Sequence, residues 1–297
     1  MRRDNFLILA VLYVFNAWTW SVDSTAVNPH RHRRDPYGIG KSVQLSIVPS
    51  SVDDMYIACT LETKQMVKDT YLPNEIEKNV IFKSAWSEAE MCAKNVENRF
   101  KTDNSKYNPT ELEHDHVKAI CAYSGVNPKI HDMFNKAVLS EKDDHSFQFH
   151  SLHFLLTDAL HLLKKTQLKC HKTFRRTKND FEGEVGQEIR FGFFASSCTE
   201  KDLLKLAFGD KSCFEIDTCF GADLKSYPIL GNFEKEVLIP PYEVFCITAV
   251  LKKENDPNLW CDVVYQLHST TEPKSFQKCK LYNTSKAYIE SLSLKKI

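Results

Sequence analysis

Apolar positions recur with the period of a helix in the first part of the chain and with that of a strand in the second. Leu152, Leu155, Leu156, Ala159 and Leu163 form one stripe at helical spacing, which we expect to face the core. From Lys169 onward, apolar residues alternate or cluster between glycines and prolines, as in strands; they include Phe191, Phe193, Phe214, Ile216, Val244, Phe245, Ile247, Ala249, Val263 and Tyr265. A run of helices followed by a run of strands predicts an α+β fold rather than a doubly wound sheet.

Local signals indicate where some elements begin and end. Ser87 with Glu90, and Thr110 with Glu113, have the spacing of a capping box, so we expect one helix to begin near each pair. Gly125 is expected to end the second of these helices. Residues 252–257 have the composition of a hairpin turn, and Cys246 and Cys261 on its two sides could then be joined by a disulfide.

The amino-terminal segment has the features of an export signal. Arg2 and Arg3 precede a short apolar run, residues 6–15, which fits a signal peptide over about residues 1–20 and is too short to span a bilayer. Residues 21–34 could be a propeptide, because they end in the basic cluster 31–34. We expect residues 35–297 to form a single domain.

Charge and cysteine content narrow the class of protein further. Lys+Arg and Asp+Glu each number 39, so nothing in the net charge favours a nucleic-acid partner. All ten cysteines lie between residues 59 and 279, and in an exported chain disulfides are expected. We expect no metal: the chain has no Cys-x-x-Cys pair, and the histidines at 114, 116, 150 and 153 are interpreted as surface or packing residues.

The strongest candidates for catalytic residues lie in residues 234–241, where Glu234 and Glu236 flank Lys235 and an apolar run follows. In an extended strand, residues i and i+2 project to the same side, so both carboxylates would point together. Two carboxylates placed side by side shift each other's pKa values, and catalytic sites use such pairs to give two acids different roles. The alternative for an isolated Glu-x-Glu is the solvated edge of a strand.

Two segments upstream of the Glu-x-Glu motif carry further candidate site residues. Arg175 lies in Thr-Phe-Arg-Arg at 173–176, and Ser196 lies in Phe-Phe-Ala-Ser-Ser-Cys at 193–198. With Glu-x-Glu and the Val-Leu-Ile-Pro-Pro that follows it, the chain resembles the secreted and cell-surface mono-ADP-ribosyltransferases over about residues 50–285. Residues 151–163 and 216–222 resemble that family's helix before the first catalytic strand and its central strand. The resemblance implies a helical first half, a strand-rich core of two packed sheets, and disulfides Cys59–Cys279 and Cys170–Cys219.

The resemblance also implies roles for the motif residues. Arg175 would bind the phosphates of NAD⁺, Glu236 would stabilise the oxocarbenium-like centre, and Ser196 would support the ribose and orient Glu236. Glu234 would hold the guanidinium of an arginine acceptor. The implied activity transfers ADP-ribose from NAD(P)⁺ to arginine on proteins or small guanidino compounds and releases nicotinamide. An NAD⁺ glycohydrolase using the same site, or a catalytically silent secreted binding protein, are the alternatives.

Three departures from the family pattern bear on activity. Arg176 replaces a residue that is usually small and could alter how the phosphates approach, Cys198 replaces a serine, and Phe174 replaces a frequent tyrosine. The carboxy-terminal residues 294–297 lack the apolar run of a lipid-anchor signal, so we expect a secreted protein without a stable membrane anchor. Asn283, in Asn-Thr-Ser, is a candidate glycosylation site.

Overall fold

The computed structural model describes residues 36–38, 40–102, 112–125, 128–141, 147–201, 208–225, 227–228 and 235–284. All of them belong to one compact unit of the chain, residues 33–297. The expected signal peptide, the basic cluster at 31–34, Thr110, Glu234 and the carboxy-terminal tail lie outside the described residues.

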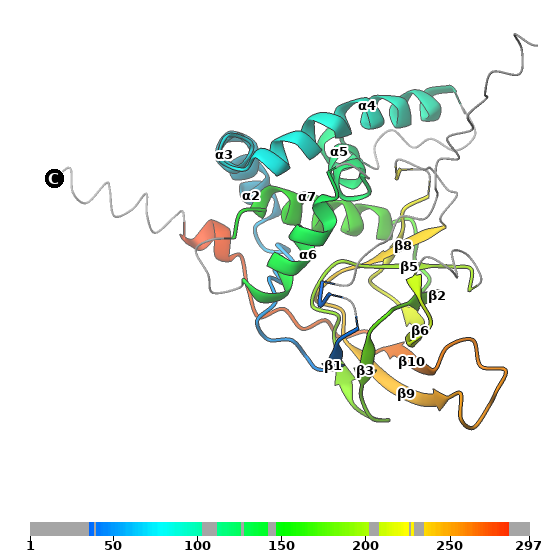
Figure 1. The fold of residues 1–297 in the computed structure, drawn as a ribbon. Helices are drawn as coiled ribbons and strands as arrows, with labels where there is room; N and C mark the ends of the chain where they lie inside the picture. The colour runs from blue at the N-terminus through cyan, green and yellow to red at the C-terminus, as the bar shows by residue number, and fades with distance from the viewer. Residues whose placement is uncertain are drawn as a thin grey trace, which may run out of the picture. The chain divides into compact units, whose positions relative to one another are not determined.

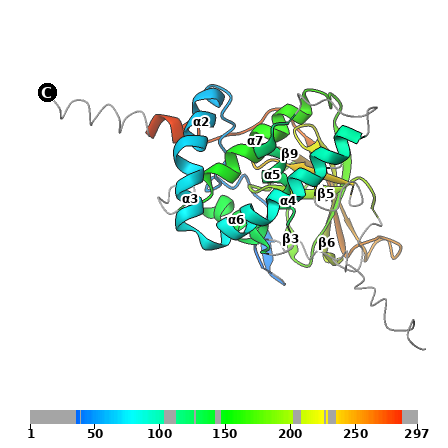
Figure 2. The same cartoon turned by 90° about the horizontal axis from the view of Figure 1, so that it is seen from above.

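Helices occupy the first part of the described chain and gather on one side of the strands (Figures 1 and 2). A π-helical turn, Val67–Tyr71, joins the first two α-helices. The α-helices are α2 Thr60–Met66, α3 Leu72–Lys78, α4 Val80–Thr102, α5 His114–Tyr123, α6 Ile130–Ser140 and α7 His150–Lys164. The predicted stripe on α7 is buried, with Leu152, Leu156 and Ala159 at 0% exposure. The prediction that this stripe faces the core is therefore confirmed.

All strands except β1 follow the helices, and the strands form two sheets, which confirms the predicted α+β class. The large sheet has eight strands in the order β4-β9-β10-β6-β2-β5-β8-β7, and a small parallel pair joins β1 to β3. The strands are β1 Ser42–Gln44, β2 His171–Arg176, β3 Asp180–Glu182, β4 Glu188–Ile189, β5 Ala195–Cys198, β6 Ser212–Thr218, β7 Ala222–Asp223, β8 Glu236–Ile239, β9 Phe245–Lys252 and β10 Val263–Ser269. Neighbours in the large sheet are antiparallel except β10 and β6.

One helix start differs from the capping-box predictions, and the other lies directly beside its predicted pair. Ser87 lies inside α4, which begins at Val80 because the Asn79 side chain accepts a hydrogen bond of 3.0 Å from the Phe82 amide. α5 begins at His114, with Glu113 itself as the N-cap. Its backbone amide donates to His116 Nδ1 at 3.1 Å. The predicted end near Gly125 is close to the observed one at Tyr123.

Four disulfides join the described cysteines. Two are the pairs that the resemblance implied, Cys59–Cys279 and Cys170–Cys219, and two join cysteines left unassigned or paired differently, Cys92–Cys121 and Cys213–Cys261. In both views the red segment that contains Cys279 lies beside the start of α2 (Figures 1 and 2). The Cys59–Cys279 bond thus ties the two ends of the described chain together.

The predicted Cys246–Cys261 disulfide is wrong, although the hairpin itself is present. In the β9–β10 register Lys252 faces Val263 near the turn, whereas Cys246 faces His268 at the far end of the hairpin. Six residues of strand separate Cys246 from Lys252, which is about 20 Å at the usual rise. Cys261 instead reaches Cys213, because β10 also pairs with β6 on its other side. Cys246 remains a thiol.

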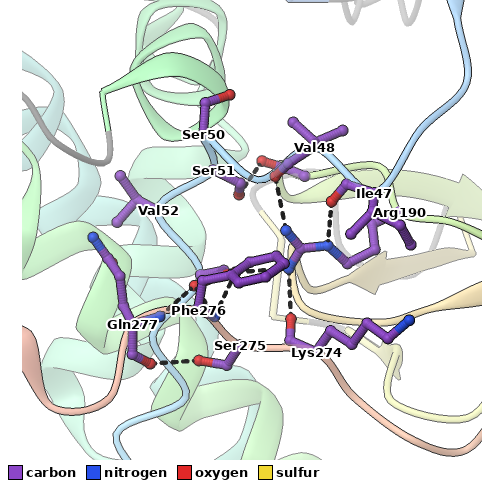
Figure 3. A network of polar contacts seen from close by, with 12 residues as sticks. Ile47, Val48, Ser50, Ser51, Val52, Arg190, Lys274, Ser275, Phe276 and Gln277 are labelled. Carbon is purple, nitrogen blue, oxygen red and sulfur yellow. Dashed lines mark hydrogen bonds and ion pairs between the residues drawn. The ribbon is translucent and has the colours of Figure 1, made fainter.

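A buried ion pair between Arg190 and Asp53 holds the segment that leads into β5, and Figure 3 shows Arg190 with the backbone carbonyls around it. Arg190 Nη1 lies 2.7 Å from Asp53 Oδ2, and both side chains have 0% exposure. The same guanidinium donates to the carbonyls of Ile47 at 2.6 Å and Val48 at 2.8 Å, and it stacks over the Phe276 ring at 5.0 Å. Two segments distant in sequence, residues 47–53 and the segment around Phe276, are therefore fixed around residue 190.

Gly192 continues this anchored segment toward β5. Its φ is 71°, in the left-handed region, and a Cβ there would lie 2.8 Å from a Val48 methyl carbon. Its carbonyl accepts a hydrogen bond of 2.6 Å from the Ser51 hydroxyl. The path of the chain into the strand that carries Ser196 is therefore set by contacts with residues 47–53.

Candidate functional site

The three motif segments form adjacent strands of the large sheet. β5 pairs with β2 through Phe174 and Cys198, and with β8 through four residue pairs that include Ser196 with Leu238 and Cys198 with Glu236. Arg175 and Ser196 are 21 residues apart in sequence, and Ser196 and Glu236 are 40 apart. The order of strands in the sheet therefore brings these three segments side by side.

Ser196 and Glu236 are joined directly. The Ser196 hydroxyl donates a hydrogen bond of 2.7 Å to Glu236 Oε1. The two residues are 7% and 2% exposed. Because the hydroxyl donates, it holds one carboxylate oxygen in place and leaves Glu236 oriented as a carboxylate base or electrostatic stabiliser.

Arg175 lies on the neighbouring strand and is held from two sides. Its Nη1 donates to the carbonyl oxygen of Ser196 at 2.8 Å. Its guanidinium carbon lies 5.5 Å from the Phe193 ring centroid and 6.0 Å from that of Phe191. Cation–π contacts of this kind help to keep a buried guanidinium in position.

A small cavity borders this guanidinium. It is lined by Tyr123, His131, Asn135, Arg175, Phe193, Phe194 and Ser196. The Asn135 amide nitrogen donates to the Tyr123 hydroxyl and to the Phe194 carbonyl, both at 3.1 Å. Among the described residues, no group donates to the buried Asn135 Oδ1. This oxygen is itself shielded from solvent.

Sequence reasoning did not identify Tyr123 or Asn135 as site residues. Tyr123 lies on α5 and Asn135 on α6, far from the motif strands in sequence. Asn135 stands among the buried apolar residues Phe134 and Val138 of α6. A polar amide on the apolar side of a helix is the one signal that could have singled it out.

The approach to β8 differs from the predicted extended strand. β8 begins at Glu236, and Lys235 has a φ of 43°, in the left-handed region. The extended backbone on which the i, i+2 argument rests is therefore not present at Lys235 itself. Glu234 lies outside the described residues. Glu236 itself is held on the other side of β8 as well, since the Leu224 amide donates to its carbonyl at 2.9 Å.

Arg176 lies on the opposite face of β2 from Arg175. Its guanidinium carbon stacks 4.5 Å from the Trp260 ring centroid, and its Nη1 donates to the Trp260 carbonyl at 3.4 Å. Phe174, on the same side of the strand, contacts Trp260 edge-on. Alternation along the strand turns the Arg176 side chain away from Arg175, and an effect of Arg176 on the approach of phosphates stays a prediction.

The remaining departure, Cys198, is not in a disulfide. The amide of Glu200 donates to its sulfur at 3.3 Å. Asn283, the candidate glycosylation residue, is exposed, and its side-chain amide donates to the Lys278 carbonyl at 3.0 Å.

The clustered histidines are engaged by protein groups. His116 Nε2 lies 3.0 Å from Asp158, and His114 lies between Glu90 and Glu97. His153 bridges the Tyr56 hydroxyl and the Val52 carbonyl, and burial lowers its pKa to about 3. Over the described ranges, no three or more His, Cys, Asp or Glu side chains are grouped so as to hold a metal ion. The helices described here include none long and apolar enough to cross a bilayer.

Comparisons with known proteins indicate the family of this chain. Residues 45–266 match the family described as NAD:arginine ADP-ribosyltransferase. Ecto-ADP-ribosyltransferase 4 of Homo sapiens is 30% identical over 215 residues, which cover 68% of this chain and 64% of the relative. NAD(P)(+)--arginine ADP-ribosyltransferase 2 of Gallus gallus is 31% identical, with 70% and 65% covered. The chain thus spans slightly less than two thirds of the length of these relatives.

Solved structures agree with the sequence relatives. The eucaryotic mono-ADP-ribosyltransferase ART2.2 superposes with a TM-score of 0.65 at 28% identity, covering 80% of this chain and 98% of that one. Mutants of ART2.2 in complex with NADH and with NAD each give a TM-score of 0.63. With the sequence match over residues 45–266, this chain belongs to the NAD:arginine ADP-ribosyltransferase family.

Proposed function

We propose that this protein transfers ADP-ribose from NAD⁺ to arginine side chains and releases nicotinamide. The observation that carries the proposal is the hydrogen bond from Ser196 to Glu236, on strands directly beside the one that bears Arg175. The names of the relatives add support, since several of them are called arginine ADP-ribosyltransferases.

The donor would bind across Arg175 and the cavity next to it. A guanidinium is planar and permanently charged, so it suits the two phosphates of NAD⁺. Arg175 is kept in place by Ser196 and the two phenylalanines, so little ordering remains when the donor binds. NADP⁺ is a possible second donor, as the names of the relatives indicate for those enzymes.

Glu236 would act at the bond that breaks. Departure of nicotinamide leaves positive charge on the ribose, and a carboxylate beside that sugar stabilises the charge, as in glycoside hydrolysis. Ser196 would hold the carboxylate in the orientation this requires. The electron pair of the broken bond leaves with nicotinamide, and the attacking nitrogen of the acceptor forms the new bond. No metal takes part in the proposed reaction.

The acceptor would be an arginine side chain on a protein, with small guanidino compounds as substitutes. Glu234 is proposed to hold the guanidinium and to assist loss of its proton during attack, because a free arginine has a pKa of about 12.5 or above.

We propose that the protein is secreted and acts on extracellular or cell-surface proteins. Four disulfides suit an oxidising compartment. Relatives are named ecto-ADP-ribosyltransferase, and one from Homo sapiens is named as GPI-linked. For this chain we propose glycosylation at Asn283.

The test measures two products of one reaction. The full chain, secreted from eukaryotic cells, is given labelled NAD⁺ and agmatine, and both nicotinamide and ADP-ribosyl-agmatine are quantified. We expect the wild type to form both, and Glu234→Gln to keep nicotinamide release while losing transfer. Nicotinamide release without labelled agmatine in the wild type would establish a glycohydrolase instead. A folded protein that does neither, and that NAD⁺ does not stabilise against heat, would be a binding protein.

A further inference from the structure

The end of α5 and the middle of α6 hold the chain just before β5. The Tyr123 hydroxyl donates a hydrogen bond of 2.7 Å to the carbonyl of Phe194, and the Asn135 side-chain nitrogen donates to the same carbonyl at 3.1 Å. The Asn135 nitrogen also donates to the Tyr123 hydroxyl at 3.1 Å, which closes a triangle of buried groups. Phe194 directly precedes Ala195, the first residue of β5, so both helices determine where that strand begins.

The start of β5 needs this support because its pairing with β2 is short. β5 pairs with β8 through four residue pairs, whereas the ladder between β5 and β2, both fully described, consists of Phe174 with Cys198. Ser196 therefore lies beyond the paired part of β5 on the side of β2, where the Arg175 side chain donates to its carbonyl at 2.8 Å. The cavity next to Arg175 lies here, and the two helical residues line it as well.

The helices provide a rigid base for these contacts. Cys121, two residues before Tyr123 on α5, is joined by a disulfide to Cys92 of α4. The Tyr123 ring packs edge-on against Phe134 with centroids 6.2 Å apart, and the Phe194 ring stacks on the same phenylalanine at 5.5 Å. These ring contacts do not use the Tyr123 hydroxyl, so its hydrogen bond can be removed while the packing stays.

Asn135 is an unfavourable residue for its position if its role is packing alone. It is 5% exposed on the apolar side of α6, and its buried Oδ1 accepts no hydrogen bond from the described residues. A buried acceptor without a donor destabilises a fold, and an apolar side chain of similar size would avoid that cost. What distinguishes the amide from such a side chain is its nitrogen, which donates to Tyr123 and Phe194.

We propose that Tyr123 and Asn135 are positioning residues of the active site. By holding the Phe194 carbonyl they fix the start of β5, and with it the Ser196 hydroxyl that orients Glu236. Their effect on the reaction is indirect, through the place of the strand, and neither side chain acts on the donor itself. The inference rests on the proposed function, because it concerns the rate at which nicotinamide is released.

The test measures kcat for nicotinamide release from NAD⁺ by the full chain and by variants that each remove one donor. We expect Tyr123→Phe and Asn135→Leu each to lower kcat about three- to tenfold, the range for one lost hydrogen bond. We also expect the Tm of Asn135→Leu to be no lower than that of the wild type, since the variant removes an acceptor without a donor. A role in packing alone would not separate rate from stability in this way.

Tyr265→Phe is the matched control for Tyr123→Phe. The Tyr265 hydroxyl is also buried and also donates to a backbone carbonyl, that of Phe181 in β3. The two substitutions therefore remove the same kind of hydrogen bond at different places in the fold. We expect kcat of Tyr265→Phe to stay within about twofold of the wild type.

A double-variant cycle with Ser196→Ala tests whether Tyr123 acts through Ser196. Once the Ser196 hydroxyl is gone, its position no longer matters, so we expect the further change Tyr123→Phe to lower kcat less than about twofold. An effect as large in that background as in the wild type would overturn the inference. So would a kcat within twofold of the wild type for both single variants, or an equal loss in Tyr265→Phe; in these cases the proposed function still stands. If the folded wild type releases no nicotinamide, the proposed function fails and the inference fails with it.

Discussion

The Ser196 hydroxyl donates a hydrogen bond of 2.7 Å to Glu236 Oε1 across two adjacent strands, and both side chains are buried. A carboxylate held in this way loses orientational freedom before any substrate arrives. Preorganisation of this kind lowers a barrier only where the carboxylate acts in the transition state. The proposed role of Glu236 can therefore be tested by removing this hydrogen bond.

Removing the Ser196 hydroxyl should slow the reaction more than it weakens donor binding. A hydrogen bond to a charged group corresponds to about a ten- to hundredfold effect, so we expect Ser196→Ala to lower kcat by that amount with a smaller change in KM for NAD⁺. Ser197→Ala is the matched control, since that hydroxyl donates to the Val237 carbonyl at 2.9 Å and leaves Glu236 untouched. Equal losses of kcat in the two variants would contradict the assigned role of Ser196.

Replacing Arg176 by the small residue usual in the family should affect stability and leave the donor site unchanged. Arg176 stacks on Trp260 on the face of β2 that points away from Arg175. We expect Arg176→Gly to lower Tm while KM for NAD⁺ stays within about twofold of the wild type, because no site contact is removed. Arg175→Lys should raise that KM clearly, since an ammonium cannot form the planar fork. A large change of KM in Arg176→Gly would place Arg176 in the donor site after all.

The Arg190–Asp53 pair should be among the most sensitive positions for stability. Breaking a buried pair by removing one partner leaves an uncompensated charge and costs about 3–5 kcal/mol. We therefore expect Arg190→Met to lower the free energy of unfolding, measured by denaturant titration, by about that amount. Lys211→Met removes the exposed partner of Asp262 and is expected to change stability little. A small effect of Arg190→Met would show that residues 47–53 and 274–277 are held by other contacts.

Glu75 gives the fold a pH dependence of predictable sign. Its carboxylate accepts the amides of His150 and Ser151 at the start of α7, and burial raises its pKa from 4.5 to about 7. Because the folded-state pKa is the higher one, the stability that the group contributes is fully present below pH 4.5 and is lost as the pH rises to about 7. The loss amounts to about 2–3 kcal/mol.

Glu75→Gln does not titrate and serves as the reference for that dependence. The free energy of unfolding is measured from pH 4 to 8 for both proteins. Relative to the variant, the wild type should lose stability as the pH rises through that window. A difference that stays constant with pH would show that the Glu75 pKa is the same in the folded and unfolded chains.

The sequence predicted those features that depend on periodicity and on the order of motifs. The apolar stripe of α7 is visible in single residues, and the order of Arg175, Ser196 and Glu236 places them on strands that the sheet brings together. The parts it did not predict depend on register and backbone conformation. Cys246 and Cys261 flank a real hairpin turn, yet the register places Cys246 beside His268. The φ of Lys235 leaves no pattern in residue type, because lysine is not a residue that signals a left-handed turn.

The site also includes residues that no motif marks. Asn135 and Tyr123 reach the cavity beside Arg175 from helices whose packing only the full fold specifies. Arg176 was expected near the donor, but its neighbour Trp260 comes from the loop between β9 and β10, and that contact could not be foreseen from the spacing of residues along the chain.

The most direct test of the account is the initial rate of nicotinamide release from NAD⁺ by the wild type and by Glu236→Gln, since this step is common to transfer and hydrolysis. We predict measurable release by the wild type and a loss of about a hundred- to a thousandfold in the variant, as expected when one preorganised electrostatic group is removed. A Glu236→Gln protein that is folded and releases nicotinamide at the wild-type rate would contradict the central role of Glu236.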